Sequence, residues 1–250
     1  MTGVGAYNTM PLASVTSPQS GEVHVWQVSL STLRASGDGW TGLSPEEQAR
    51  YRRFRRDEDA HRFAARRTAL RHILSAYLQC DLAEVAYETM DAAGKPVLAQ
   101  PHQGEVVFNA SSSADIALIA VAQEGTIGVD VEYARPFEDM GQIARQYFTV
   151  DEVARLEARP PSQRCDAFYR LWTSKEALLK AEGAGLPGGL DRFEVSSDPS
   201  RPPELLDDAA GPARFHLYAA DPGNGYFGAV ATDRPDLSVL HFAFDPGDLR

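Results

Sequence analysis

The segment TIGVDVEYARP at residues 126–136 has the apolar pattern of a buried strand, yet it carries two acids, Asp130 and Glu132. Alternate side chains of a strand leave by the same face, so both carboxylates are expected on one face, with Val129 and Val131 on the other. At a spacing of roughly 7 Å the two charges repel each other by about 2 kcal/mol. The fold must therefore offset this repulsion with a solvated edge, a nearby Arg or Lys, or a divalent cation.

A second segment, FYRLWTSKEALLKAEGAGL at residues 168–186, also places charges among apolar residues. Helical spacing puts Trp172, Glu176 and Lys180 on one face. As an exposed pair, Glu176 and Lys180 would contribute only about 0.2–0.5 kcal/mol. However, only three of the 24 Lys and Arg residues are Lys, and two of these, Lys175 and Lys180, flank this glutamate. Because a buried charge needs a partner or a function, the helix is a candidate for chemistry.

Bulk composition narrows the classes of function. A chain of 250 residues can bury a substantial core as one large domain or two small ones. Its net charge of -11 argues against general binding of nucleic acid. Cys80 and Cys165 lie far apart without metal-ligand spacing, which indicates neither zinc nor a disulfide framework. With no apolar run of membrane length and no basic leader at the start, we expect a cytoplasmic protein without a membrane anchor.

The predicted elements alternate along the chain in a repeated order. A strand at 22–30 precedes a helix with Ser44 as N-cap and Glu47 as capping-box acid, running to about Cys80 with a break near residues 57–59. A polar serine turn is expected between two strands within 105–123. Residues 93–99 are expected to form a Gly-Pro turn that leads into a short strand. The remaining predicted elements are helices at 140–158 and 163–185 (ending at Gly183 and Gly185) and short strands at 191–197, 213–220, 225–232 and 237–244.

Strands and helices segregate in this order, which favours an α+β fold. Both halves run strand, helices, short strands, so we expect two pseudo-symmetric lobes, each a small, mostly antiparallel sheet packed on a long helix. The predicted organisation is a flexible tail at 1–21, an N-terminal lobe at 22–125 on the nucleotide side, and a C-terminal lobe at 126–250 that carries the acidic and lysine motifs.

Three carboxylates from two elements, Asp130, Glu132 and Glu176, form the oxygen-rich set that Mg²⁺ accepts. Such a cation would be one way to offset the repulsion in the strand. Lysines next to such a site would bind phosphate oxygens, so the pattern indicates phosphoryl-type transfer.

Four motifs occur along the chain in this order: GKP (94–96), FNASSS (108–113), IGVDVE (127–132) and FYRLWTSKEALLKAEGAGL (168–186). In these motifs and their spacing the chain resembles the phosphopantetheinyl transferases, specifically their two-lobed, monomeric type. Weaker likeness extends over residues 43–74 and 147–156. The resemblance implies transfer of the 4′-phosphopantetheine arm of coenzyme A to a serine of an acyl or peptidyl carrier protein, in an active site between the lobes of a monomer.

The resemblance also implies roles for individual residues. Asp130, Glu132 and Glu176 would hold Mg²⁺ on the coenzyme A diphosphate. Glu176 would also be the base for the carrier serine, and Lys180 would stabilise charge on the phosphates. Glu152 matches an acid near the carrier serine. Seven positions are expected around coenzyme A. Arg50, His61 and Arg62 would approach its 3′-phosphate, and the other four are Lys95, Ser111, Ser112 and the motif lysine Lys175.

One departure from the family pattern concerns the nucleotide. The family usually has histidine in Asn-x-Ser-His-Ser, whereas this chain has Ser112. The loss of that histidine is expected to weaken coenzyme A binding unless an arginine replaces it. Two alternatives therefore remain: a catalytically weak protein of the same fold that binds carrier proteins or nucleotide, and a different metal-dependent phosphotransferase. The pathway served, whether fatty acid, polyketide or nonribosomal peptide, is not encoded in these motifs.

Overall fold

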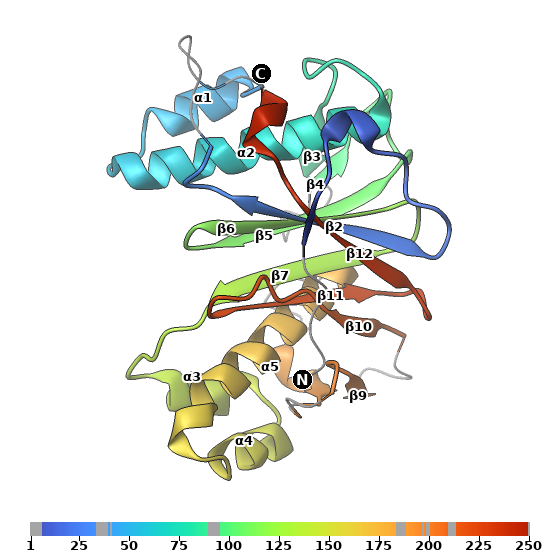
Figure 1. Cartoon of the computed structure of the whole chain (residues 1–250). Coiled ribbons are helices and arrows are strands. Elements are labelled where there is room, and N and C mark those ends of the chain that lie inside the picture. Colours follow the sequence, from blue (N-terminus) through green and yellow to red (C-terminus); the bar gives the residue numbers. More distant parts are fainter. Residues whose placement is uncertain are drawn as a thin grey trace.

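Four layers build the fold (Figure 1). From one side to the other they are helix α2 (Asp57–Leu78), a five-stranded sheet, a three-stranded sheet and helix α5 (Pro161–Glu182). The computed structural model describes residues 7–33, 40, 42–89, 96–183, 189–196, 198, 201–209 and 214–249. No helix in these ranges combines the length and the apolar character needed to cross a membrane. The α+β fold with two lobes is as predicted.

The larger sheet belongs mainly to the N-terminal lobe. Its central strands pair antiparallel, whereas the strands on the other side of β2 join in parallel. Strand β5 forms one edge. In spatial order the strands are β1 (Asn8–Thr9), β12 (Ser238–Ala243), β2 (Glu22–Ser29), β6 (Ile116–Ala122) and β5 (Val107–Ser113).

The smaller sheet is fully antiparallel and packs on α5. Its order is β10 (His216–Ala219), β11 (Tyr226–Thr232) and β7 (Ile127–Tyr133). Two hairpin-like pairs complete the strands, namely β3 (Tyr87–Thr89) with β4 (Pro96–Leu98), and β8 (Phe193–Val195) with β9 (Leu205–Asp208). The other helical segments are η1 (Leu12–Ser14), α1 (Pro45–Tyr51), α3 (Met140–Tyr147), α4 (Val150–Glu157), η3 (Leu190–Arg192) and η4 (Pro246–Leu249).

Three apolar cores lie between the four layers. Trp26 and Ile73 belong to the core between α2 and the large sheet. Phe168 belongs to the core between α5 and the small sheet. The third core, which includes Leu118 and Val129, joins the two sheets face to face. The lobes are therefore held together by apolar burial, the dominant favourable term in folding.

Local capping chemistry explains where the helices begin. Ser44 and Glu47 form the predicted capping box at α1. Residues 52–56 separate α1 from α2, so the break in the helix lies just before the predicted position. The three acids at 57–59 form the first turn of α2, where the positive end of the helix dipole stabilises them. The predicted helix at 140–158 is two helices, since Thr149 starts a new capping box at α4. Gly183 ends α5 in the left-handed conformation, as predicted, while Gly185 lies outside the described residues.

Two further expectations differ from the structure. The serines at 111–113 belong to β5 and do not form the predicted turn, which lies at Ala114 and Asp115. Strand β12, predicted for the C-terminal lobe, pairs with β2 in the sheet of the N-terminal lobe. A boundary at residue 125 therefore does not separate the two sheets.

Part of the predicted flexible tail is bound to the body of the protein. Strand β1 pairs with β12, the hydroxyl of Tyr7 donates to the carbonyl of Ala220 (2.9 Å), and the amide of Leu12 donates to Asp248 (3.3 Å). Residues 1–6 of that tail lie outside the described ranges.

Candidate active site

Close contact between β7 and α5 sets the geometry of the site. Gly128 lies directly against the backbone of α5, so that a Cβ added to it would stand 2.1 Å from the carbonyl oxygen of Ala177 and 2.4 Å from the amide nitrogen of Ala181. Only glycine lets a strand approach a helix this closely. The next inward-facing residue of β7, Asp130, consequently lies beside Lys180 of α5.

Asp130 is the centre of the polar cluster. Its side chain is almost completely buried, and Oδ1 accepts hydrogen bonds from Lys180 Nζ (2.7 Å) and from the hydroxyl of Ser111 (2.8 Å). Lys180 also donates to the Ser111 hydroxyl (3.0 Å) and to the carbonyl of Val129 (3.2 Å). The second oxygen of Asp130, Oδ2, is buried with no hydrogen-bond partner among the described residues. One carboxylate oxygen is thus satisfied by the protein, while the other is available to a cation.

Glu132 lies two residues along the same face of β7. Its Oε2 accepts a hydrogen bond from Ser113 (2.5 Å), and the hydroxyl of Ser113 in turn accepts one from the amide of Tyr133 (3.1 Å). Burial raises the pKa of Glu132, and the charge of Asp130 raises it further. The strand therefore tolerates two acids because β5 supplies one serine to each and α5 supplies an ammonium to one.

Glu176 shares the electrostatic environment of these two acids. Burial raises the pKa of its carboxyl to about 6, the charges of Asp130 and Glu132 act in the same direction, and Lys180 opposes them. In the described part of the chain, no group of three or more His, Cys, Asp or Glu side chains is arranged closely enough to hold a metal ion. The structure therefore brings the three predicted carboxylates into one charge cluster but does not show a metal centre.

The predicted nucleotide residues of the first lobe are more scattered. The Nε2 of His61 lies 3.0 Å from the carbonyl oxygen of Leu30, and Arg62 pairs with Glu58 (2.7 Å). Arg50 lies over the ring of Phe63, with 5.0 Å between its guanidinium carbon and the ring centroid. Within the described residues, Ser112 makes no hydrogen bond with Arg50, His61 or Arg62. Lys95, another predicted nucleotide residue, lies outside the described residues.

Ser112 contacts an arginine that the sequence did not single out. Arg66 of α2 donates to its hydroxyl from Nη1 (3.3 Å). Adjacent residues of a strand point to opposite faces, so Ser111 and Ser113 face β7 while Ser112 faces α2. Ser113 and Arg66 are the residues near the site that sequence reasoning missed. The serine at 113 could have been found from the same period-two pattern that paired Asp130 with Glu132.

The assignments of Glu152 and Lys175 have to be corrected. Both side chains are completely buried, and Lys175 Nζ lies 2.6 Å from Glu152 Oε2. Lys175 also donates to the carbonyls of Leu190 (2.9 Å) and Phe193 (2.5 Å), so its three protons are used. Neither residue can contact coenzyme A or a carrier serine in this structure. The sequence contains a pattern that indicates this structural role: Thr149 stands three residues before Glu152, which is the spacing of a capping box.

Comparison with known proteins shows which family the sequence matches. Residues 126–231 match the model of the 4′-phosphopantetheinyl transferase superfamily, and residues 26–124 match the model of a 4′-phosphopantetheinyl transferase N-terminal domain. The chain is similar to the 4′-phosphopantetheinyl transferase HetI of Nostoc sp., with 37% identity over 188 residues, covering 74% of this chain and 78% of that protein. It is also similar to the 4′-phosphopantetheinyl transferase Sfp of Bacillus subtilis, with 33% identity over 196 residues, covering 78% and 84% of the two chains. The protein therefore belongs to the 4′-phosphopantetheinyl transferase family.

Proposed function

We propose that the cluster of Asp130, Glu132, Glu176 and Lys180 is where this 4′-phosphopantetheinyl transferase moves the phosphopantetheine arm of coenzyme A to a serine of an acyl or peptidyl carrier protein. The other product is adenosine 3′,5′-bisphosphate. One observation carries the proposal: the two carboxylate oxygens of Asp130 differ in their contacts. Oδ1 accepts a hydrogen bond from Lys180, whereas Oδ2 is buried without a hydrogen-bond partner in the described residues.

Mg²⁺ fits the chemistry of this donor set. Three carboxylates supply hard oxygen ligands, and their mutual repulsion, expressed in the raised pKa values of Glu132 and Glu176, would be relieved by a cation. The three carboxylates do not form a closed metal centre among the described residues. Asp130, Glu132 and Glu176 would draw together to hold the ion, with Oδ2 of Asp130 as the oxygen that has no competing partner in the described part of the chain. When bound, Mg²⁺ would neutralise charge on the coenzyme A diphosphate.

The protein groups perform the remaining tasks. Glu176, ionised at neutral pH with a pKa of about 6, accepts the proton of the carrier serine directly or through one water. The serine oxygen forms a bond to the phosphorus that bears the pantetheine arm, and the bond from that phosphorus to the oxygen bridging the diphosphate breaks. Lys180 donates to Ser111 (3.0 Å) beside Asp130, so both side chains would donate to the phosphates and stabilise the leaving group.

The architecture supports a monomer as the active unit. Ser111 comes from β5 in the N-terminal lobe, Asp130 from β7 and Lys180 from α5, and these residues contact one another within one chain. A second copy is therefore not needed to complete this cluster. We infer a cytoplasmic location from the proposed reaction, because coenzyme A and apo carrier proteins are intracellular substrates.

Mass spectrometry of a carrier protein tests the proposal. The protein is incubated with coenzyme A, Mg²⁺ and an apo carrier protein, and we expect a mass gain of one phosphopantetheine group on the carrier serine. Asp130→Ala, Glu132→Ala and Glu176→Ala should each abolish the gain while the protein stays folded, because each change removes a cation ligand and relieves repulsion. Glu157→Ala, which removes an exposed acid paired with Arg145, is the matched control.

The metal assignment has its own decisive result. Near-normal turnover of Asp130→Ala at limiting Mg²⁺ would contradict it. Absence of any mass gain with the parent protein on several carrier types would instead support a catalytically weak binding protein of the same fold.

A further inference from the structure

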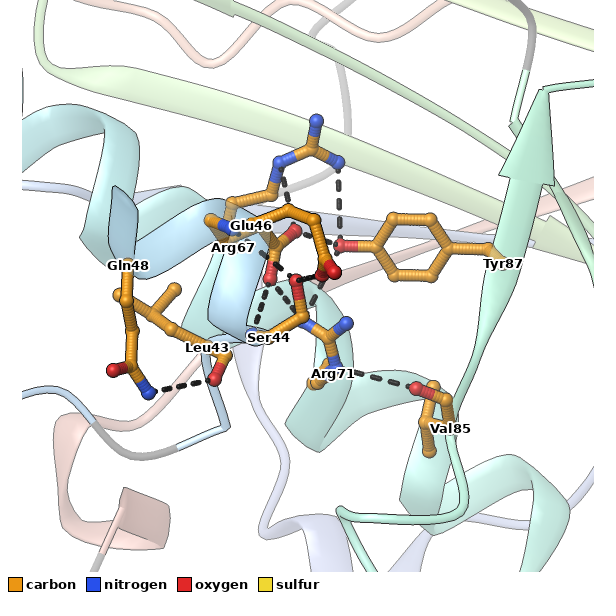
Figure 2. Close-up of polar contacts among 9 residues, drawn as sticks. Leu43, Ser44, Glu46, Gln48, Arg67, Arg71, Val85 and Tyr87 are labelled. Carbon is orange, nitrogen blue, oxygen red and sulfur yellow. Dashed lines mark hydrogen bonds and ion pairs between the residues drawn. The ribbon is translucent and has the colours of Figure 1, made fainter. Parts of the chain in front are cut away.

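A second charged cluster lies where α1, α2 and β3 meet; Figure 2 labels Ser44, Arg67, Arg71 and Tyr87 of this cluster, whose central acid is Glu47. Its carboxylate accepts hydrogen bonds from Arg71 (2.5 Å) and from the hydroxyl of Tyr87 (2.7 Å), and its Oε1 lies 3.3 Å from Arg67 Nε. The same carboxylate caps α1 by accepting from the amide of Ser44 (2.9 Å). One acid thus compensates two arginines of α2.

Arg66, next in sequence to Arg67, forms no ion pair with Glu47, whose charge acts on it only from a longer distance. The hydroxyl of Ser112 is neutral, and no carboxylate in the described residues lies within ion-pair distance of the Arg66 guanidinium. Burial lowers the pKa of Arg66, and the charges of Arg67 and Arg50 act in the same direction. Because a guanidinium stays protonated in proteins, this environment stores electrostatic free energy that an anion would release.

A cavity of about 320 Å³ opens at this arginine. Arg66 and Arg67 supply its cationic wall, and Tyr87 its aromatic one. Glu88 is also a lining residue, and because its carboxylate would repel an anion, an anionic group is expected on the arginine side of the cavity. The full lining is Arg66, Arg67, Leu70, Tyr87, Glu88, Pro96 and Ala110.

Strand β5 connects this cavity to the catalytic cluster. Ser111 contacts Lys180 and Asp130 on one face, whereas Ser112 contacts Arg66 on the other, and β5 is the edge of its sheet. A ligand with two anionic groups could cross this edge and use both faces. Coenzyme A has that form, since its ribose carries the diphosphate at the 5′ position and a monophosphate at the 3′ position.

We propose that Arg66 binds the 3′-phosphate of coenzyme A and makes the protein selective for the 3′-phosphorylated nucleotide. The proposal rests on the proposed function for the identity of the ligand. A bidentate guanidinium contact suits a phosphate, and it replaces the imidazole that the family usually has at the position of Ser112.

Calorimetric titration with two nucleotides, without metal or carrier protein, tests this role. Adenosine 3′,5′-bisphosphate and adenosine 5′-monophosphate are compared on the parent, Arg66→Gln and the control Arg145→Gln, which loses the same charge from an exposed ion pair far from the cavity. We expect Arg66→Gln to bind the bisphosphate about tenfold to a hundredfold more weakly and the monophosphate within about twofold of the parent. Arg66→Lys should retain part of the preference.

A histidine placed at position 112 provides a second test of the arginine contact. Ser112→His should not tighten bisphosphate binding, because the contact is already made by Arg66 and a protonated imidazole would repel it. An equal loss for both nucleotides, or unchanged bisphosphate affinity in Arg66→Gln, would overturn the proposal. If the parent prefers the bisphosphate through Arg66 but modifies no carrier, the proposed function fails while the role of Arg66 in nucleotide binding stands.

Discussion

Replacement of Lys175 by methionine separates a structural role from a ligand-binding one. The ammonium is completely buried and makes three contacts, so its removal leaves the buried carboxylate of Glu152 without its counter-charge. Removing one partner of a buried ion pair costs about 3–5 kcal/mol. For a chain of this size each kcal/mol corresponds to about 2–4 °C, so we expect the melting temperature to fall by about 6–20 °C.

Thermal and denaturant unfolding in the absence of ligand measure this loss. Glu152→Gln should destabilise the protein in the same way, and the double variant should lose less than the sum of the two single changes, by about 1 kcal/mol or more. Arg145→Gln, at an exposed pair, should cost less than about 1 kcal/mol. An unchanged melting temperature combined with lost coenzyme A affinity would refute the structural role and restore the ligand-binding one.

Three shorter predictions concern the other charged residues. Binding of Mg²⁺ should weaken as the pH drops below about 6, because the carboxyl of Glu176, whose pKa burial raises to about 6 in the metal-free protein, becomes protonated and competes with the cation; metal titrations at several pH values measure this. Lys180→Arg should lower kcat at saturating coenzyme A, because a planar guanidinium cannot reproduce the contacts of the ammonium with Asp130 and its neighbours. A kcat equal to that of the parent protein would contradict this argument. Glu47→Gln should destabilise the protein by about 3–5 kcal/mol in denaturant unfolding, because Arg71 loses its buried partner, and a stability equal to the parent's would show that the pair is screened by water.

Much of the architecture follows from local signals in the chain. Ser44 with Glu47 marks a helix start, and the alternation around Asp130 marks an inner strand with two acids on one face. These features depend on neighbours close in sequence, which is why spacing is sufficient to predict them.

The missed features depend on partners that are distant in sequence. In isolation the serines of β5 have the composition of a turn. They lie in a strand, where Ser111 and Ser113 donate hydrogen bonds to the acids of β7. Arg66 is one of four arginines of α2, and only tertiary contacts show that Arg67 and Arg71 pair with Glu47 whereas Arg66 contacts the neutral hydroxyl of Ser112. Resemblance placed Glu152 at the reaction, whereas its burial with Lys175 is a property of the packed core.

The parallel pairing of β12 with β2 has a consequence for biosynthesis. Strand β12 (Ser238–Ala243) follows β2 (Glu22–Ser29) only after a long stretch of chain, so on the ribosome one side of β2 stays unpaired until β12 has emerged. An unpaired edge strand that carries buried apolar residues such as Val23 and Val25 is a template for pairing with other chains. A product that stops before residue 238 would retain the acidic cluster but expose that edge, so premature termination should yield aggregates instead of a shorter active enzyme.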